Sequence, residues 1–379
     1  MHVEVKPELL RWARERAGRS QASLRKRFPH LESWEREEAK PTLRQLEAFA
    51  RATFVPIGYL FLAEPPQEVV PIPDLRIRGG EPLGPLSPDL LDVLYLCQRR
   101  QMWYRHHAMS VRQEPHRFVG SVRLGDPVDR AADAMKRNLG FDLEVRRACP
   151  TWTDALRLFI DQAEDLGVLV MVSGVVGSNN KRKLDPDEFQ GFALADHLAP
   201  LVFLNGADTK AAQMFTLAHE LAHVWLGESA ISDVNPDSAP SQPVERWCNE
   251  VAAELLVPLQ VLREVLPKRE PLAEVQDLAR RFKVSTLVIL RRILDAGRIS
   301  RGTFQEAYDQ ELERLRSLSK SSGGDFYLTQ GARLSKCFAR ALVVSTLEGQ
   351  TSFTEAFRLL GVKKMATFRE LGSSLGVAI

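Results

Sequence analysis

Cysteine is scarce in this chain and is never clustered. The 379 residues contain no CxxC pair. A disulfide framework and a zinc cage of thiolates both need closely spaced cysteines, so this distribution argues against both. We expect reduced, buried thiols at all four positions: Cys97, Cys149, Cys248 and Cys337.

A large net charge and a long apolar run are also missing. The formal net charge is +2, so any surface that attracts nucleic acid must be a local patch. No uninterrupted apolar stretch is long enough to span a membrane. The first residues, MHVEVKPELLRWARERAG, lack the apolar core of a signal peptide. We therefore expect a cytoplasmic protein with no membrane partner.

The composition and length predict a soluble chain of several domains. Hydrophobic residues make up 44% and charged residues 26%, as in ordinary globular proteins. The length exceeds that of one typical domain. We predict four segments: a compact helical domain over 1–65, a linker and helix over 66–117, a mixed domain of helices and strands over 118–300, and a helical region over 301–379.

The pattern before residue 118 is helical with one interruption. Residues 7–62 have helical apolar spacing, with Pro41 at the start of one helix. Residues 64–88 are rich in proline and glycine and form a linker or an extended segment. Ser87 and Pro88 then begin a further helix.

After residue 118 the pattern predicts an α+β fold with a small sheet packed on helices. Helices are expected over 126–141 and 151–167, an apolar strand over 167–177, a polar loop over 179–189 and two strands within 189–206. From about 244 onward the chain reads as helical, with a break at 317–326.

The sequence HELAH, residues 219–223, carries the clearest chemistry. On a helix, His219 and His223 lie one turn apart on the same face, so both rings can bind one metal ion. Glu220 is rotated by about 100° from His219 and can reach a water on that ion. The alternative is two buried core histidines and a solvated carboxylate, but such a set is costly to bury without a metal.

A catalytic zinc ion needs a third protein ligand and an open position. The next predicted helix, 244–258, offers Glu245, Glu250 and Glu254. Glu245 is the preferred ligand, because Asn249 lies one turn further on and can hydrogen-bond a metal-binding side chain. Glu254 is the second choice. An exposed helix charge is the alternative for Glu245, and manganese or iron would also suit this ligand set.

FTLAHELAHVWLG followed by ExxCNxxAAELLVP resembles the ImmA/IrrE family of zinc metallo-endopeptidases. The preceding PLVFLNG strand fits as well, and the resemblance covers about 160–260. It implies a zincin-like fold, Zn²⁺ as cofactor, His219, His223 and Glu245 as ligands, and Glu220 as the base. His197 is a candidate to steady the oxyanion, against a plain surface or core histidine.

The resemblance also implies a biological setting. Members of this layout carry an N-terminal XRE-type helix-turn-helix and cleave a repressor or another regulator in stress, mobile-element or phage-defence responses. Some members act as antitoxin-like partners of a toxin. The competing interpretation is therefore a DNA-binding or toxin-neutralising regulator whose zinc site is structural or vestigial.

Three segments are candidates for nucleic-acid contact. In the N-terminal one, Gln21 and Trp34 are 13 positions apart, about one helical turn fewer than the motif needs, and 29–38 is acidic. DNA binding competes there with docking, dimerisation or substrate recognition. Residues 275–297 form a second helix-turn-helix candidate, and a helical hairpin with solvated arginines is preferred. For 99–107, we expect inward aromatics and solvated arginines rather than base stacking.

Overall fold

The computed structural model describes residues 2–68, 70–78, 81–82, 86–232, 242–267, 269–318 and 334–378. Its contacts divide the chain into two units. The first unit comprises residues 1–71 and 84–92, and the second comprises residues 72–83 and 93–379. The chain thus leaves the first unit at residue 71 and returns briefly to it before the second unit continues.

The first unit is the helical bundle that the sequence predicts over 7–62. Its elements are α1 (Pro7–Arg16), α2 (Gln21–Arg25), α3 (Leu31–Glu35), α4 (Leu43–Thr53) and the 3-10 helix η1 (Ile57–Phe61). Thr42 and Gln45 form a capping box that begins α4. Leu10, Phe28 and Phe49 are at the centre of the core. The shortness of α2 and α3 agrees with the helical turn that is missing between Gln21 and Trp34.

The second unit is built on a four-stranded sheet in the order β3-β7-β6-β8. The strands are β3 (Leu169–Ser173), β6 (Gly191–Leu194), β7 (Leu201–Asn205) and β8 (Ala230–Ser232). β3 is parallel to β7, and the other pairs are antiparallel. The fold is therefore mixed α+β, as predicted.

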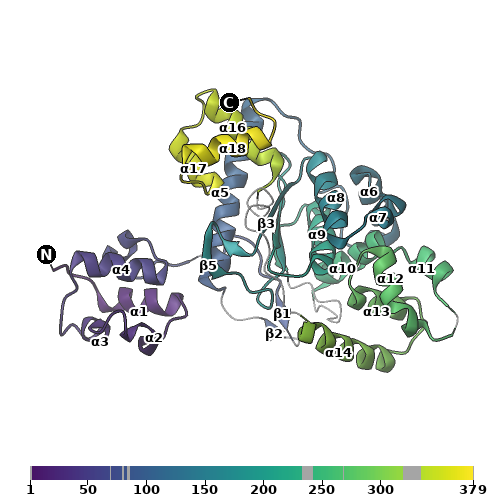
Figure 1. Ribbon diagram of the computed structural model, residues 1–379, viewed down its shortest axis with the longest axis horizontal. Coiled ribbons are helices and arrows are strands. Elements are labelled where there is room, and N and C mark those ends of the chain that lie inside the picture. The colour runs from purple at the N-terminus through teal and green to yellow at the C-terminus, as the bar shows by residue number, and fades with distance from the viewer. Residues whose placement is uncertain are drawn as a thin grey trace. The chain divides into compact units, whose positions relative to one another are not determined.

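Helices cover both faces of this sheet (Figure 1). On one face α8 (Trp152–Asp165) packs on β3, and α9 (Lys210–Leu226) packs on β6 and β7. On the other face α5 (Pro88–Ser110) sends Gln101 to the carbonyls of Leu194 and Ala199. The Ser87 hydroxyl caps α5 as predicted, accepting the N–H of Leu90.

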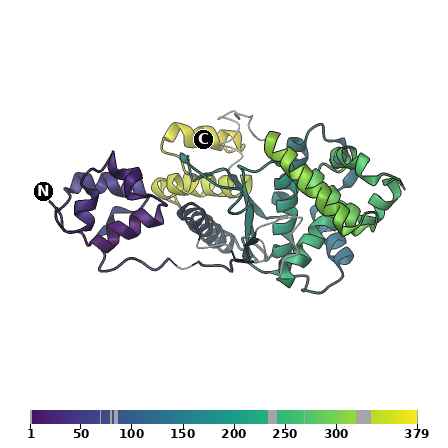
Figure 2. The same cartoon turned by 90° about the horizontal axis from the view of Figure 1, so that it is seen from below.

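The remaining elements surround this centre. They are the strand pair β1 (Ile77–Arg78) and β2 (Glu81–Pro82), with the helices α6 (Val128–Leu139), α7 (Leu143–Ala148), α10 (Pro243–Leu256), α11 (Leu259–Val265), η2 (Pro271–Glu274), α12 (Val275–Phe282), α13 (Thr286–Asp295), α14 (Arg301–Leu318), α16 (Lys336–Leu347), α17 (Phe353–Leu360) and α18 (Met365–Ser374). α14, the long light-green helix of Figure 2, packs on α13. Most of the predicted break at 317–326 lies outside the described residues.

The polar loop predicted over 179–189 is wrong in its first half. Residues Asn179–Lys183 form β5, which pairs with β4 (Val175–Val176) in an antiparallel hairpin. Gly177 supplies the positive φ of 55° that the tight turn requires. The strand escaped notice because NNKRK has no apolar alternation: four of its five side chains are exposed.

Residues 275–297 contain the consecutive helices α12 and α13, which contact each other. Leu278, Phe282 and Ile289 belong to the core of the second unit. The expectation of solvated arginines is wrong for Arg292, which is 5% exposed. Its guanidinium binds the Val257 carbonyl and the Glu254 carboxylate, so it completes the end of α10.

The basic and aromatic stretch 99–107 also packs inward. Tyr104 is buried, and Trp103 meets Phe338 edge to face. Here too one arginine departs from the expectation, because Arg100 is 7% exposed and donates to the Leu359 carbonyl. An aromatic helix that packs against α16 and α17 leaves little face for stacking on bases.

The expectation of buried thiols is met at two of the four positions. All four cysteines are free; Cys97 and Cys248 are buried, but Cys149 and Cys337 are only half-buried. Among the described residues, none of the helices combines the length and apolar character that crossing a membrane requires.

Candidate metal centre

α9 carries the HELAH sequence through the middle of the second unit. Thr209 caps its start through the Ala212 N–H, and Gly227 ends it with a φ of 76°. Every residue from 213 to 225 is buried. A helix buried on all sides has no solvated face for polar side chains, so His219, Glu220 and His223 must find partners inside the protein.

Three of the sequence candidates meet at one point. His219 Nε2 lies 3.1 Å from His223 Nε2. Glu245, at the start of α10, places one oxygen 3.4 Å from His219 Nε2 and the other 3.0 Å from His223 Nε2. Side-chain donors about 2.0 to 2.1 Å from one tetrahedral ion stand roughly 3.3 Å apart. These spacings are those that a shared metal ion needs.

Asn249 orients the first histidine. Its side-chain oxygen lies 2.9 Å from His219 Nδ1. Because an amide oxygen only accepts, Nδ1 must carry the proton, and the Nε2 lone pair faces His223 and Glu245. Asn249 thus fixes the ring and its tautomer, as expected for a residue that supports a metal ligand.

Charge in this pocket is distributed unequally between two glutamates. Burial works against ionisation of Glu245, but His219 and His223 outweigh it and lower the pKa of Glu245 to about 2. Burial, reinforced by the charge of Glu245, raises the pKa of Glu220 well above its ordinary value, and the Ser232 hydroxyl opposes this rise. Burial lowers the pKa of His223. One carboxylate is thus prepared to bind a cation and the other to hold a proton.

The residues fit a bound metal. Within the described part of the chain, both oxygens of Glu220 are buried and neither makes a hydrogen bond of good geometry, although the Ser232 hydroxyl acts on the pKa of this carboxyl. Two imidazoles and one carboxylate form the protein ligand set of a catalytic zinc site, which keeps a further position open. An unpartnered buried carboxylate beside such a set is costly unless a water or substrate completes it.

The structure separates the other candidates from this cluster. Glu254 accepts the Leu259 N–H and binds Arg292, so it completes a helix end instead. Glu250 is exposed on α10. His197 is exposed, and its backbone carbonyl accepts the His116 N–H.

Two residues at the site escaped the sequence reasoning. The Ser232 hydroxyl lies 3.4 Å from both His223 Nε2 and a Glu245 oxygen. A β-carbon on Gly191 would stand 2.7 Å from Thr216 Cγ2 and 3.1 Å from a Glu220 oxygen, so glycine leaves room for that carboxylate. A three-residue strand and a lone glycine have no periodic pattern that would have revealed them.

Known proteins are similar in sequence to this region. Residues 163–294 match the family described as the IrrE N-terminal-like domain, Peptidase_M78. The chain is 35% identical over 91 residues to the radiation response metalloprotease IrrE of Deinococcus radiodurans, covering 22% of this chain and 28% of that protein. It is 32% identical over 91 residues to the same-named protein of Deinococcus deserti, covering 22% and 32%.

The matches leave most of the chain and of these relatives uncompared. The aligned part spans about a third or less of the length of each curated relative. Residues 334–374 match a second family, described as a domain of unknown function, DUF8813. No solved structure matches the chain. Residues 163–294, which hold the candidate metal centre, thus resemble the metallopeptidase domain of the ImmA/IrrE family.

Proposed function

We propose that this protein is a zinc-dependent endopeptidase that cleaves a regulatory protein. The observation that carries the proposal is the pairing of a ligand set, His219, His223 and Glu245, with the buried and unpartnered carboxyl of Glu220. A structural metal site would need no such free acid beside it.

Each residue of the centre has a distinct task in this proposal. His219, His223 and Glu245 hold the metal, and Asn249 keeps His219 in the binding tautomer. Zinc, when bound there, supplies a Lewis acid that makes a water acidic near neutral pH and polarises a carbonyl. Glu220 takes the proton of the attacking water and gives it to the leaving amine. The raised pKa of Glu220 favours its second task.

The identity of the substrate rests on the resemblance to the family. A repressor or an antitoxin-type regulator is the substrate class we propose. A DNA-binding or toxin-neutralising role without cleavage is the alternative, and it would use the first unit of the chain.

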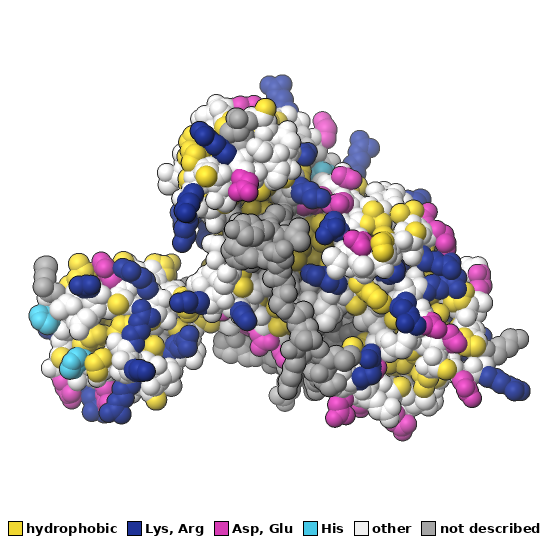
Figure 3. All heavy atoms as spheres, in the orientation of Figure 1, with side chains coloured by type: hydrophobic (Ala, Val, Ile, Leu, Met, Phe, Trp, Pro, Cys, Tyr) yellow, Lys and Arg dark blue, Asp and Glu magenta, His cyan; other side chains and the backbone are white. Residues whose placement is uncertain are grey.

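The first unit gives DNA binding little support. The five residues of α3 occupy the recognition position, and Leu31, Trp34 and Glu35 of these are buried. The residues left to contact a DNA groove are Glu32 and Ser33 within the helix and His30 and Arg36 at its ends. On the face drawn in Figure 3, basic and acidic side chains are intermixed over this unit, without one basic stripe. We therefore propose protein recognition for it.

The test is cleavage of a partner in cells. The full-length chain is co-expressed with each product of the neighbouring genes, as wild type, as Glu220→Gln and as Glu250→Gln. We expect a shortened partner with wild type and with Glu250→Gln, and an intact partner with Glu220→Gln. A stable uncut complex formed equally by all three forms would support the binding alternative instead.

A further inference from the structure

β8, the last strand of the sheet, borders the metal centre. Its residue Ser232 contacts His223 and Glu245, while Ile231 faces the opposite way along the backbone. One edge of β8 pairs with β6. Within the described residues, the other edge of β8 presents the N–H and C=O of Ile231, groups of the kind with which an extended polypeptide can pair.

That outer edge is filled by the chain itself. The Ile231 N–H donates to the Pro73 carbonyl at 3.0 Å, and the Leu75 N–H donates to the Ile231 carbonyl at 3.0 Å. Asp74 and Ile231 form a parallel bridge. Residues 73–76, here called the edge segment, thus form an isolated β-bridge along the outer edge of the four-stranded sheet.

Most of the edge segment lies at the surface. Pro73 and Asp74 are exposed, and Leu75 is half-buried. Only Arg76 is deeply seated, at 2% exposure, with its guanidinium 2.8 Å from Asp74 and 3.5 Å from Glu188. Proline cannot donate to a ladder, so Pro73 also stops the pairing from extending toward the first unit. A segment whose first two residues are exposed and whose third is half-buried suits a reversible occupant.

We propose that the outer edge of β8 is the strand on which an extended polypeptide substrate pairs, and that the edge segment occupies this place until it is displaced. The inference rests on the proposed peptidase function and adds a substrate position and its internal competitor. The edge segment follows the first unit in the chain, so a partner bound to that unit has a covalent connection to it.

The first measurement is binding of a peptide with the segment's own sequence. Fluorescein-labelled VPIPDLRIR, residues 70–78, is titrated into full-length, zinc-loaded Glu220→Gln protein and followed by anisotropy. The tethered segment competes at high effective concentration, so we expect weak binding. Adding Arg76→Ala should tighten binding at least tenfold. Arg130→Ala, which removes an exposed arginine of α6, is the matched control and should change nothing.

A second variant and a second readout distinguish release of the edge segment from misfolding of the protein. Leu75→Pro removes the N–H that Ile231 accepts and should act like Arg76→Ala. Hydrogen exchange of residues 72–76 and of Ile231 should speed up in both variants. Equal peptide binding by all forms would overturn the proposal, as would unchanged exchange in both variants.

Hydrolysis separates this inference from the proposed function. With Glu220 restored, Arg76→Ala should lower the KM for a cleaved partner and leave kcat nearly unchanged. If no form cleaves anything while peptide binding follows the expected pattern, the proposed hydrolysis fails and the assignment of the edge stands. If cleavage occurs and Arg76→Ala alters neither KM nor peptide binding, the edge assignment fails alone.

Discussion

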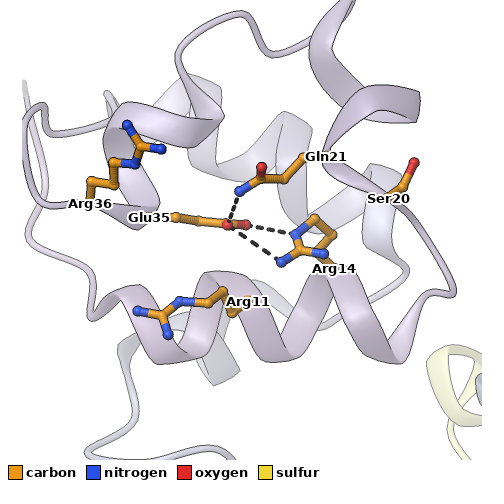
Figure 4. Close-up of a pocket in the computed structure, with 6 residues that line it drawn as sticks. All are labelled: Arg11, Arg14, Ser20, Gln21, Glu35 and Arg36. Carbon is orange, nitrogen blue, oxygen red and sulfur yellow. Dashed lines mark hydrogen bonds and ion pairs between the residues drawn. The ribbon is translucent and has the colours of Figure 1, made fainter.

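Two buried glutamates, one in each unit, have opposite surroundings. Glu35 in the first unit is 6% exposed, and it receives Arg14 Nε at 2.8 Å and Gln21 Nε2 at 2.5 Å. Figure 4 shows both side chains directed at its carboxylate, in a pocket of about 470 Å³. Glu220 in the second unit is 0% exposed, and within the described residues neither of its oxygens makes a hydrogen bond of good geometry.

The surroundings of Glu35 and Glu220 separate a glutamate that stabilises the fold from one that is available for a reaction. A buried carboxylate that is paired and hydrogen-bonded holds helices together, because its charge is satisfied in the folded state. A buried carboxylate left without protein partners is a candidate for binding a water, an ion or a substrate. Glu164 is intermediate: it accepts the Lys336 N–H, and burial raises its pKa to about 7.

The largest effect is expected from Glu220→Gln. Loss of a general acid and base lowers kcat by roughly 10² to 10⁴-fold. Since glutamine replaces a buried carboxyl with a neutral side chain of similar size, the thermal midpoint should stay equal or rise, and bound zinc should be retained. Glu250→Gln on α10 is the exposed control. A Glu220→Gln enzyme with nearly full activity would contradict the assigned role.

Removing the partner of Glu35 should instead act on stability alone. Arg14→Ala leaves Glu35 buried with only Gln21, at an expected cost of about 3 kcal/mol to the first unit. Arg11→Ala, an exposed neighbour in the same pocket, should cost less than about 0.5 kcal/mol. Urea unfolding of full-length protein, monitored by hydrogen exchange within 7–62, measures both. Equal effects would mean that Glu35 is not held by Arg14.

Glu164 should make stability depend on pH. Its folded pKa of about 7 exceeds the unfolded value of 4.5, so the folded state binds more protons between these values. The free energy of unfolding should therefore fall by about 2 kcal/mol as pH rises from 5 to 8. Glu164→Gln should flatten this dependence, and the exposed neighbour change Asp165→Asn should not. An equally steep profile in Glu164→Gln would assign the dependence elsewhere.

Gly191→Ala tests whether Glu220 needs the empty space beside it. The added methyl would crowd Thr216 and the Glu220 carboxylate. We expect about a tenfold loss of kcat and a destabilisation of about 1 to 2 kcal/mol. Gly58→Ala, where a β-carbon meets nothing within 4 Å, is the control in the first unit. Unchanged kcat would show that Glu220 tolerates a closer neighbour.

The sequence predicted the elements with strong local patterns. The helix of HELAH, its end at Gly227 and the strands within 189–206 were visible, because apolar periodicity and a glycine cap are local properties. The meeting of His219, His223 and Glu245 could be anticipated from helix geometry together with the family resemblance. The direction of Asn249 toward His219 follows from the one-turn spacing between Asn249 and Glu245.

Contacts between segments far apart in the chain could not be predicted from the sequence. The contact of residues 73–75 with Ile231 joins segments more than 150 positions apart, and nothing in either stretch signals it. Arg292 was expected in solvent, yet it is buried because it satisfies the carbonyl of Val257 at a helix end. β5 was missed because its polar residues form a strand through cross-strand pairing and not through burial.

The most direct test of the account is the metal content of three purified full-length proteins: wild type, Glu245→Ala and Glu250→Ala. Both glutamates lie on α10, but only Glu245 faces the two histidines. We predict about one zinc ion per chain in wild type and in Glu250→Ala, and little or none in Glu245→Ala, because a two-histidine site lacks its third ligand. Full zinc retention by Glu245→Ala, or a wild-type protein that binds no metal, would contradict the account.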